Sequence, residues 1–163
     1  MPVTLARIDQ RLIHGITVNQ WNSELKPKRF MVVDNDISQD DTVKASMRMS
    51  KPAGTGMSII NEEKAIHNFN NGNYDSQKVF LIVKEPETLI DLAKGGVTIP
   101  KVNLGIVFNE NGRTEIDGHV ALNQKELADL QTLEKMGIPV TLQYTPTDTE
   151  VKLSDAIKDI KVG

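Results

Sequence analysis

The residues best suited to chemistry lie together near the start of the chain, within residues 6–21. Asp9, Arg11 and His14 stand there between an apolar run typical of a β-strand and an apolar-periodic run typical of a helix. Backbone N–H groups that open a helix are unpaired and attract anions. A histidine at that point can give or take a proton, or accept a phosphoryl group. The stretch therefore predicts an anion site with a reactive imidazole.

A purely structural interpretation of the same residues has to be weighed against this one. A lone histidine after a strand is more often a hydrogen-bonded structural residue, and Trp21 is most simply a core residue. The combination favours chemistry, because Arg11 precedes His14 by three residues and Gly15 follows it directly. We expect Asp9 to orient Arg11 or Arg7, since a general base there would repel an incoming phosphate.

Length and composition limit the other classes of function. A chain of 163 residues has the usual size of one domain, so a single domain over residues 1–163 is expected. The net charge of −3, without a basic stripe, disfavours nucleic-acid binding. The absence of cysteine excludes disulfides, thiolate nucleophiles and cysteine-rich zinc sites. Residues 1–7 lack the apolar region of a signal peptide and no apolar run approaches membrane-spanning length, which predicts a cytoplasmic protein.

Strands and helices are predicted to alternate along the chain. Apolar runs predict strands over residues 3–8, 30–33, 57–60, 79–83 and 102–108, and the alternating run 139–144 predicts an edge or half-exposed strand. Helices are expected over 15–25, 40–49 and 153–160, after Pro86, and after caps at Asn61 and Asn123. Residues 109–112 are expected to form a turn that joins the strand at 102–108 to a short hairpin partner at 114–116. This order predicts an α/β fold, an open, mostly parallel doubly wound sheet with helices on both faces and His14 beyond a strand's carboxyl end.

Other polar residues receive more ordinary interpretations. Asp34 and Asp36 follow the strand at 30–33, where turn chemistry is favoured over a cation site. His67 is expected to be exposed and inert, and His119 receives no role. Two other functions remain open at this point: a phosphate- or nucleotide-binding module without a covalent step, and a receiver domain that uses Asp34 or Asp36 with Mg²⁺.

The run Arg7-Ile8-Asp9-x-Arg11-Leu12-Ile13-His14-Gly15, followed by Trp21, carries a resemblance to a known family. It resembles the signature of the IIB components of the mannose/fructose/sorbose/N-acetylgalactosamine family of the bacterial phosphoenolpyruvate-dependent sugar phosphotransferase system (PTS). The similarity covers nearly the whole chain, including residues 80–84, 95–97 and 146–148. The resemblance implies an open sheet of about seven strands, with the region after Gly112 at its antiparallel edge.

The resemblance also implies an activity, that of a protein-phosphohistidine–sugar phosphotransferase. A phosphohistidine of a IIA protein or domain would phosphorylate His14 on Nδ1. His14 would then pass the phosphoryl group to a sugar held by the membrane components IIC and IID, yielding a sugar 6-phosphate. An amino sugar such as N-acetylgalactosamine is the expected substrate. The chain would be cytoplasmic and associate peripherally with the membrane through IIC and IID.

The residues around His14 suit phosphoryl transfer, which requires alignment and neutralisation of charge. The planar guanidinium of Arg11 is suited to hold phosphoryl oxygens. We expect the backbone N–H groups of the next turn to supply further donors, and Gly15 to let the backbone come close. Those donors belong to Ile13, Gly15, Ile16 and Thr17. A neutral imidazole can attack phosphorus as a nucleophile without activation by a metal, so neither a metal nor a cofactor is expected.

Overall fold

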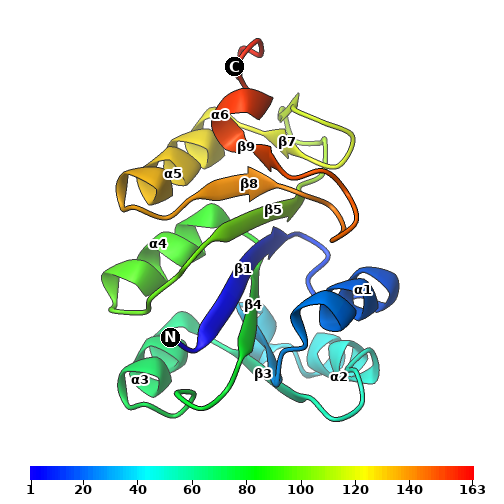
Figure 1. Ribbon diagram of the computed structural model, residues 1–163, viewed down its shortest axis with the longest axis vertical. Coiled ribbons are helices and arrows are strands. Elements are labelled where there is room, and N and C mark those ends of the chain that lie inside the picture. Colours follow the sequence, from blue (N-terminus) through cyan, green and yellow to red (C-terminus); the bar gives the residue numbers. More distant parts are fainter.

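Strands and helices alternate along most of the chain (Figure 1). The structure, a computed structural model, describes residues 1–163 except for the side chains of Ile16 and Thr17. The strands are β1 (Val3–Asp9), β2 (Arg29–Val33), β3 (Gly56–Ile60), β4 (Val79–Val83), β5 (Val102–Ile106), β6 (Thr114–Glu115), β7 (Ala121–Leu122), β8 (Val140–Leu142) and β9 (Val151–Lys152). The helices are α1 (Gly15–Leu25), the 3-10 helix η1 (Ile37–Gln39), α2 (Asp41–Met49), α3 (Glu62–Asn70), α4 (Pro86–Lys94), α5 (Gln124–Lys135) and α6 (Leu153–Ala156).

Seven of the strands form one sheet, in the order β3-β2-β4-β1-β5-β8-β9. β1 lies in the middle and is parallel to both of its neighbours, β4 and β5. The pairs β2–β3, β2–β4 and β5–β8 are also parallel, whereas β8 and β9 are antiparallel. The predicted open, mostly parallel sheet of about seven strands is therefore confirmed.

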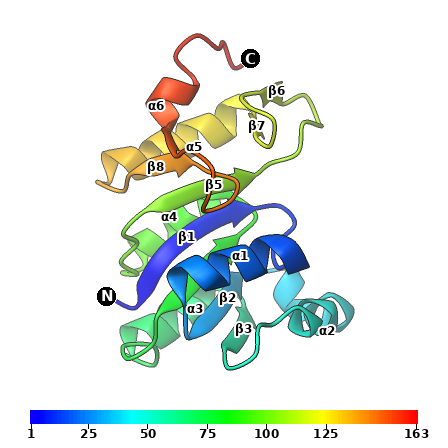
Figure 2. The same cartoon turned by 45° about the vertical axis from the view of Figure 1, so that its right-hand side comes forward.

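Helices cover both faces of the sheet, as predicted. α1 and α2 lie on one face and α3, α4 and α5 on the other (Figures 1 and 2). The strands supply both layers: in β4, Phe80 and Ile82 join the apolar cluster under α1 and α2, while Leu81 belongs to the cluster under the opposite helices. Strands buried on both faces carry such continuous apolar runs. Among the described residues, no helix combines the length and apolar character needed to cross a membrane.

The predicted helix starts at Asn61 and Asn123 are confirmed. The Asn61 side chain accepts a hydrogen bond from the Lys64 N–H at 2.7 Å. Asn123 accepts one from the Glu126 N–H at 2.8 Å, and the Glu126 carboxylate accepts one from the Asn123 N–H at 3.0 Å. Each cap satisfies N–H groups that the first turn of a helix leaves unpaired.

Four expectations in the second half of the chain were wrong. One of them placed the region after Gly112 at the antiparallel edge of the main sheet, but the strands of that region lie outside this sheet. β8 is buried and internal, because β9 pairs with its outer side and forms the antiparallel edge. Two exposed residues carry no periodic signal, so β9 was missed. The segment at 114–116 does not pair with the strand before it; β6 pairs with β7 in a separate two-stranded sheet. The last helix ends at Ala156 instead of Ile160.

The topology places the end of β1 at a crevice. The chain leaves β1 toward α1 on one face, whereas it leaves the neighbouring strands β4 and β5 toward α4 and α5 on the other face. Loops that diverge in this way at the carboxyl ends of adjacent parallel strands open the space in which α/β proteins bind ligands. The loop that carries His14 follows β1 directly.

Candidate active site

The loop between β1 and α1 is fixed by its own backbone and by two buried side chains. The Leu12 N–H donates to the Asp9 carbonyl at 2.9 Å, and Leu12 has φ +54°, a left-handed conformation that costs about 1 kcal/mol or more for a residue with a branched side chain. The side chains of Leu12 and Ile13 are buried in the apolar cluster beneath α1. Their burial offsets the strain and holds the loop in one shape.

His14 stands immediately before the first residue of α1. Its backbone is extended, with φ −146° and ψ 149°, and its side chain does not cap the helix. The side chain is 15% exposed. A Cβ added to Gly15 would meet nothing within 4 Å, so the space beside this glycine is open. The side chains of Ile16 and Thr17 lie outside the described residues.

Asp9 connects the site. Its side chain, 1% exposed, accepts hydrogen bonds from the Arg7 Nε at 3.1 Å and from the backbone N–H of Arg11 at 2.8 Å. The oxygen that contacts Arg7, Oδ2, also lies 3.2 Å from Nε2 of His14. Asp9 therefore touches the side chain of Arg7, the backbone of Arg11 and the imidazole of His14.

This contact selects one form of the imidazole ring. An ionised carboxylate only accepts hydrogen bonds, so the ring nitrogen that faces Asp9 must donate one. In the neutral ring the proton then resides on Nε2, and Nδ1 carries the free lone pair. In this arrangement Nδ1 is the ring nitrogen with a free lone pair.

The two arginines of the stretch lie in different environments. Arg7 is 1% exposed and forms an ion pair with Asp9 inside the sheet. Burial lowers the pKa of the Arg7 guanidinium from its usual value, and the neighbouring Asp9 offsets part of that change. Arg11 is exposed. Of the two guanidinium groups, that of Arg11 is therefore the one open to a ligand.

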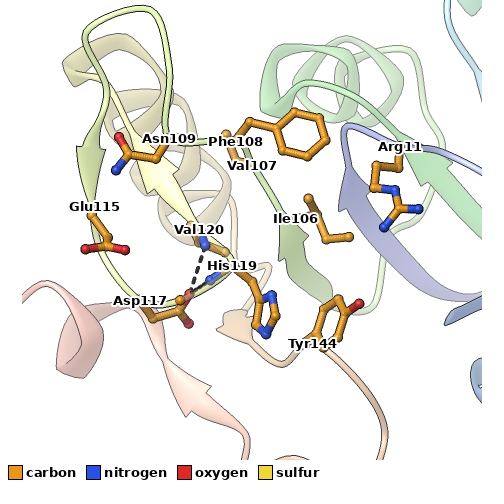
Figure 3. A pocket seen from close by; sticks show the side chains of 11 residues that line it. Arg11, Ile106, Val107, Phe108, Asn109, Glu115, Asp117, His119, Val120 and Tyr144 are labelled. Atoms are coloured by element: carbon orange, nitrogen blue, oxygen red, sulfur yellow. Dashed lines mark hydrogen bonds between the residues drawn. The ribbon is translucent and has the colours of Figure 1, made fainter.

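A pocket of about 240 Å³ lies beside Arg11 (Figure 3). The residues after β5, the turn between β6 and β7, and the residue Tyr144 after β8 line it. The His119 ring stacks on the Tyr144 ring with centroids 3.8 Å apart and planes 9° from parallel. Phe108 is 41% exposed at the same pocket. The pocket lies at the same edge of the sheet as the loop after β1, and Arg11 of that loop lines it.

Sequence reasoning missed several of these residues. His119 and Tyr144 belong to separate loops, and only the adjacency of β5 and β8 in the sheet brings their rings together. Asn103, within β5, is 1% exposed and receives a hydrogen bond from Arg7. A single polar residue within an otherwise apolar strand is the signal that would have pointed to Asn103.

The other candidates take the ordinary roles that were favoured for them. Asp34 Oδ1 accepts hydrogen bonds from the N–H groups of Asp36 and Ile37, each at 2.9 Å, which is turn chemistry at the start of η1. His67 is exposed on α3. Neither contributes to the group around His14.

Comparison with known proteins identifies the family. Residues 3–162 match the family model described as "PTS system sorbose subfamily IIB component". The chain belongs to this family. It is thus a IIB component of the mannose-type sugar phosphotransferase systems and a phosphotransferase, which confirms the resemblance carried by residues 7–15.

The chain is similar to proteins whose names specify different sugars. It is 32% identical over 160 residues to the sorbose-specific EIIB component of Lacticaseibacillus casei, with 98% of each chain covered. It is 31% identical to the mannose-specific EIIAB component of Escherichia coli K12, of which it covers 50%, and 30% identical to the N-acetylgalactosamine-specific enzyme IIB component 1 of that organism, with 94% of this chain and 97% of that one covered. The crystal structure of the IIBSor domain of the Klebsiella pneumoniae sorbose permease superposes with a TM-score of 0.94 at 27% identity over 99% of both chains.

Proposed function

We propose that His14 is the phosphocarrier residue of this IIB component and that Nδ1 is the atom that carries the phosphoryl group. The observation that carries the proposal is the contact between Asp9 Oδ2 and His14 Nε2, which leaves Nδ1 unprotonated. The position of His14 before the first turn of α1 adds backbone N–H donors on the side where the phosphoryl oxygens would lie. Residues 1–163 act as one phosphocarrier domain in this proposal.

In the first step the Nδ1 lone pair attacks the phosphorus of a donor phosphohistidine, and the phosphorus–nitrogen bond to the donor breaks. The ring of His14 becomes positively charged while Nε2 keeps its proton. Asp9, a carboxylate beside that proton, stabilises the charge that develops in the transition state. No metal or cofactor takes part in the step as proposed.

The phosphoryl oxygens require positive partners of their own. Arg11 is exposed in the loop that carries His14, and its planar fork matches two phosphoryl oxygens. The N–H groups of Gly15, Ile16 and Thr17 are proposed as the remaining donors, since those of the first helical turn have no partner within α1, together with the N–H of Ile13 in the loop before it. Asp9 fixes the Arg11 backbone through a 2.8 Å hydrogen bond. The arginine therefore starts from a defined position in the loop.

In the second step a sugar hydroxyl oxygen attacks the phosphorus, the bond to Nδ1 breaks, and the hydroxyl proton passes to water or to a base on the sugar-binding component. The phosphoryl donor is proposed to be a IIA domain. The Escherichia coli relative named EIIAB supports this, because its name joins IIA and IIB in one protein. The sugar is proposed to be held by the membrane components IIC and IID, with the IIB component at the cytoplasmic side.

An amino sugar such as N-acetylgalactosamine is the proposed substrate, in line with the relative that bears that name. The sorbose and mannose relatives are similarly close, so the sugar needs its own experiment. Phosphorylated IIB component is mixed with membranes that contain the cognate IIC and IID and with each labelled sugar in turn. Preferential formation of N-acetylgalactosamine phosphate supports the proposal, and preference for sorbose or mannose rejects it.

The carrier role is tested by intact mass after incubation with phosphoenolpyruvate, the general phosphotransferase proteins and a IIA protein. The wild type is expected to gain one acid-labile phosphoryl group, and H14A to gain none. H67A is the matched control, because His67 is also a histidine but is exposed on α3. Labelling of H14A equal to that of wild type ends the proposal. Phosphate bound without a covalent adduct in the wild type indicates a non-covalent binding module instead.

A further inference from the structure

Arg7 is a large, charged side chain that the proposed phosphoryl transfer does not contact. It lies in the central strand β1 and is 1% exposed. Its Nε donates to Asp9 Oδ2 at 3.1 Å, and its Nη1 donates to the Asn103 side-chain oxygen at 2.6 Å and to the Gln143 carbonyl at 3.2 Å. The guanidinium of Arg7 therefore donates hydrogen bonds to acceptors in β1, in β5 and at the residue after β8.

The neighbouring strand β5 is shaped to receive this guanidinium. A Cβ built on Gly105 would overlap the Arg7 guanidinium, so only glycine leaves the space that Arg7 occupies. The Asn103 amide donates to the Gln143 carbonyl at 3.0 Å while its oxygen accepts from Arg7. Asn103 is thus held in the orientation that accepts from Arg7.

The segment after β8 completes the enclosure. The Trp21 indole N–H donates to the Tyr144 carbonyl at 3.2 Å, and the Arg7 guanidinium carbon lies 5.4 Å from the centre of the Trp21 ring. The Gln143 side chain donates to the carbonyls of Pro146 and Asp148 at 3.3 and 3.0 Å. These bonds tie Gln143 to the loop that follows it and tie the Tyr144 carbonyl to α1.

One oxygen joins this buried network to the imidazole. Asp9 Oδ2 is the atom that contacts both Arg7 Nε and His14 Nε2. A displacement of the guanidinium therefore displaces the acceptor on which the ring orientation depends. Hydrogen bonds to a charged group are stronger than those between neutral groups, which makes them suited to positioning.

We propose that Arg7 is a positioning residue for phosphoryl transfer: fixed by Asn103, Gly105 and the Gln143 carbonyl, it holds Asp9 so that His14 keeps its proton on Nε2 and presents Nδ1. The inference rests on the proposed carrier role of His14. It assigns a function to Gly105 and Asn103, neither of which contacts the reacting atoms. Arg7 contacts Asp9 and not the reacting atoms. The effect of Arg7 on phosphoryl transfer therefore passes through the Asp9 carboxylate.

The test displaces Arg7 without changing any group at the reacting atoms. G105A inserts a methyl group into the space of the guanidinium, and N103A removes the acceptor of Nη1. T141V is the matched control, because Thr141 is a buried polar residue paired with Asn103 across the β5–β8 register. Folding is checked by the fluorescence of Trp21, and the ring protonation is read from ¹⁵N-labelled His14 by NMR.

The wild type and T141V are expected to show one neutral tautomer, with the proton on Nε2. G105A and N103A are expected to show a mixture of tautomers and transfer from phospho-IIA that is roughly 10-fold to 100-fold slower, in line with the cost of small misplacements. If G105A does not fold, N103A, which only removes atoms, decides the question.

Folded variants that keep the single Nε2 tautomer and the wild-type rate overturn the positioning role, and so does a wild type with its proton on Nδ1. The NMR measurement needs no phosphoryl donor, so its result is independent of whether His14 becomes phosphorylated. Loss of the carrier proposal would instead appear as unlabelled wild type in the mass experiment.

Discussion

Replacing Asp9 with asparagine separates the two contributions of this carboxylate, one to stability and one to chemistry. The side chain is 1% exposed and faces the guanidinium of Arg7, which has the same low exposure. Asparagine keeps one acceptor oxygen but removes the charge opposite Arg7. Breaking a buried ion pair by removing one partner costs about 3–5 kcal/mol. Because the Asn103 and Gln143 acceptors of Arg7 remain, we expect the lower end, about 3 kcal/mol, for D9N.

The chemical effect arises from the amide group. In D9N the amide oxygen takes the Oδ1 position, where it accepts from the Arg11 N–H, so the NH₂ group takes the Oδ2 position and faces both Arg7 Nε and His14 Nε2, now 3.1 and 3.2 Å away. That nitrogen must then accept, and the proton moves to Nδ1, where it blocks the attack. The corresponding asparagine substitution in serine proteases lowers turnover about 10⁴-fold by this route, so transfer by D9N should fall by about 10²-fold to 10⁴-fold.

Rapid quench of phosphoryl transfer from phospho-IIA gives the rate, and urea unfolding followed by Trp21 fluorescence gives the stability. D34N is the matched control, because Asp34 also accepts backbone hydrogen bonds at the end of a strand but lies outside the site. It should transfer at the wild-type rate. If folded D9N transfers at the wild-type rate, then Asp9 does not set the tautomer of His14 and the reasoning fails.

Three further predictions concern other parts of the molecule. R11A should fold as the wild type does but transfer about 10-fold to 100-fold more slowly, because the exposed guanidinium stabilises charge in the transition state; equal rates in rapid quench remove Arg11 from the mechanism. Burial and the neighbouring Asp91 raise the pKa of Glu62 from 4.5 to about 7. The folded state therefore binds the Glu62 proton more tightly than the unfolded state does. The stability that this proton provides is fully present below the unfolded pKa and is lost as the pH rises through about 7. E62Q should therefore gain about 1 kcal/mol relative to wild type between pH 5 and pH 8, a value discounted for solvent screening; urea titrations with no pH-dependent gain contradict this. N123A breaks the capping box with Glu126 and should cost about 1 kcal/mol in thermal unfolding, whereas an unchanged midpoint argues against the cap.

The sequence was sufficient for the parts of the fold that depend on local pattern. Continuous apolar runs marked β1, β2 and β4 as strands buried on both faces, and the caps at Asn61 and Asn123 marked helix starts. The motif at residues 7–15 led to the correct family because its residue types and spacing are specific. Local signals of this kind depend only on neighbours in the chain, which a single sequence displays.

What the sequence did not reveal depends on strand order. The contacts of Arg7 with Asn103 and Gln143 join residues that are far apart in the chain, and they exist only because β5 lies beside β1 and β8 lies beside β5. The stacking of His119 on Tyr144 has the same origin. β9 was missed because two exposed residues pair through backbone groups alone, and backbone pairing leaves no pattern of side chains.

The buried pair of Arg7 and Asp9 is better explained by the reaction than by stability. Removing two charges from water costs several kcal/mol per ion, and apolar side chains of similar volume fill such positions at no loss and often with a gain. β1 already carries Ala6 and Ile8 at complete burial, so an apolar residue at position 7 would continue an ordinary central strand. The chain instead holds an arginine there and keeps the Cβ of position 105 out of its way. The desolvation cost of this pair is explained if the fixed guanidinium determines which nitrogen of His14 is unprotonated. A histidine that accepts a phosphoryl group needs one unprotonated ring nitrogen before the donor arrives.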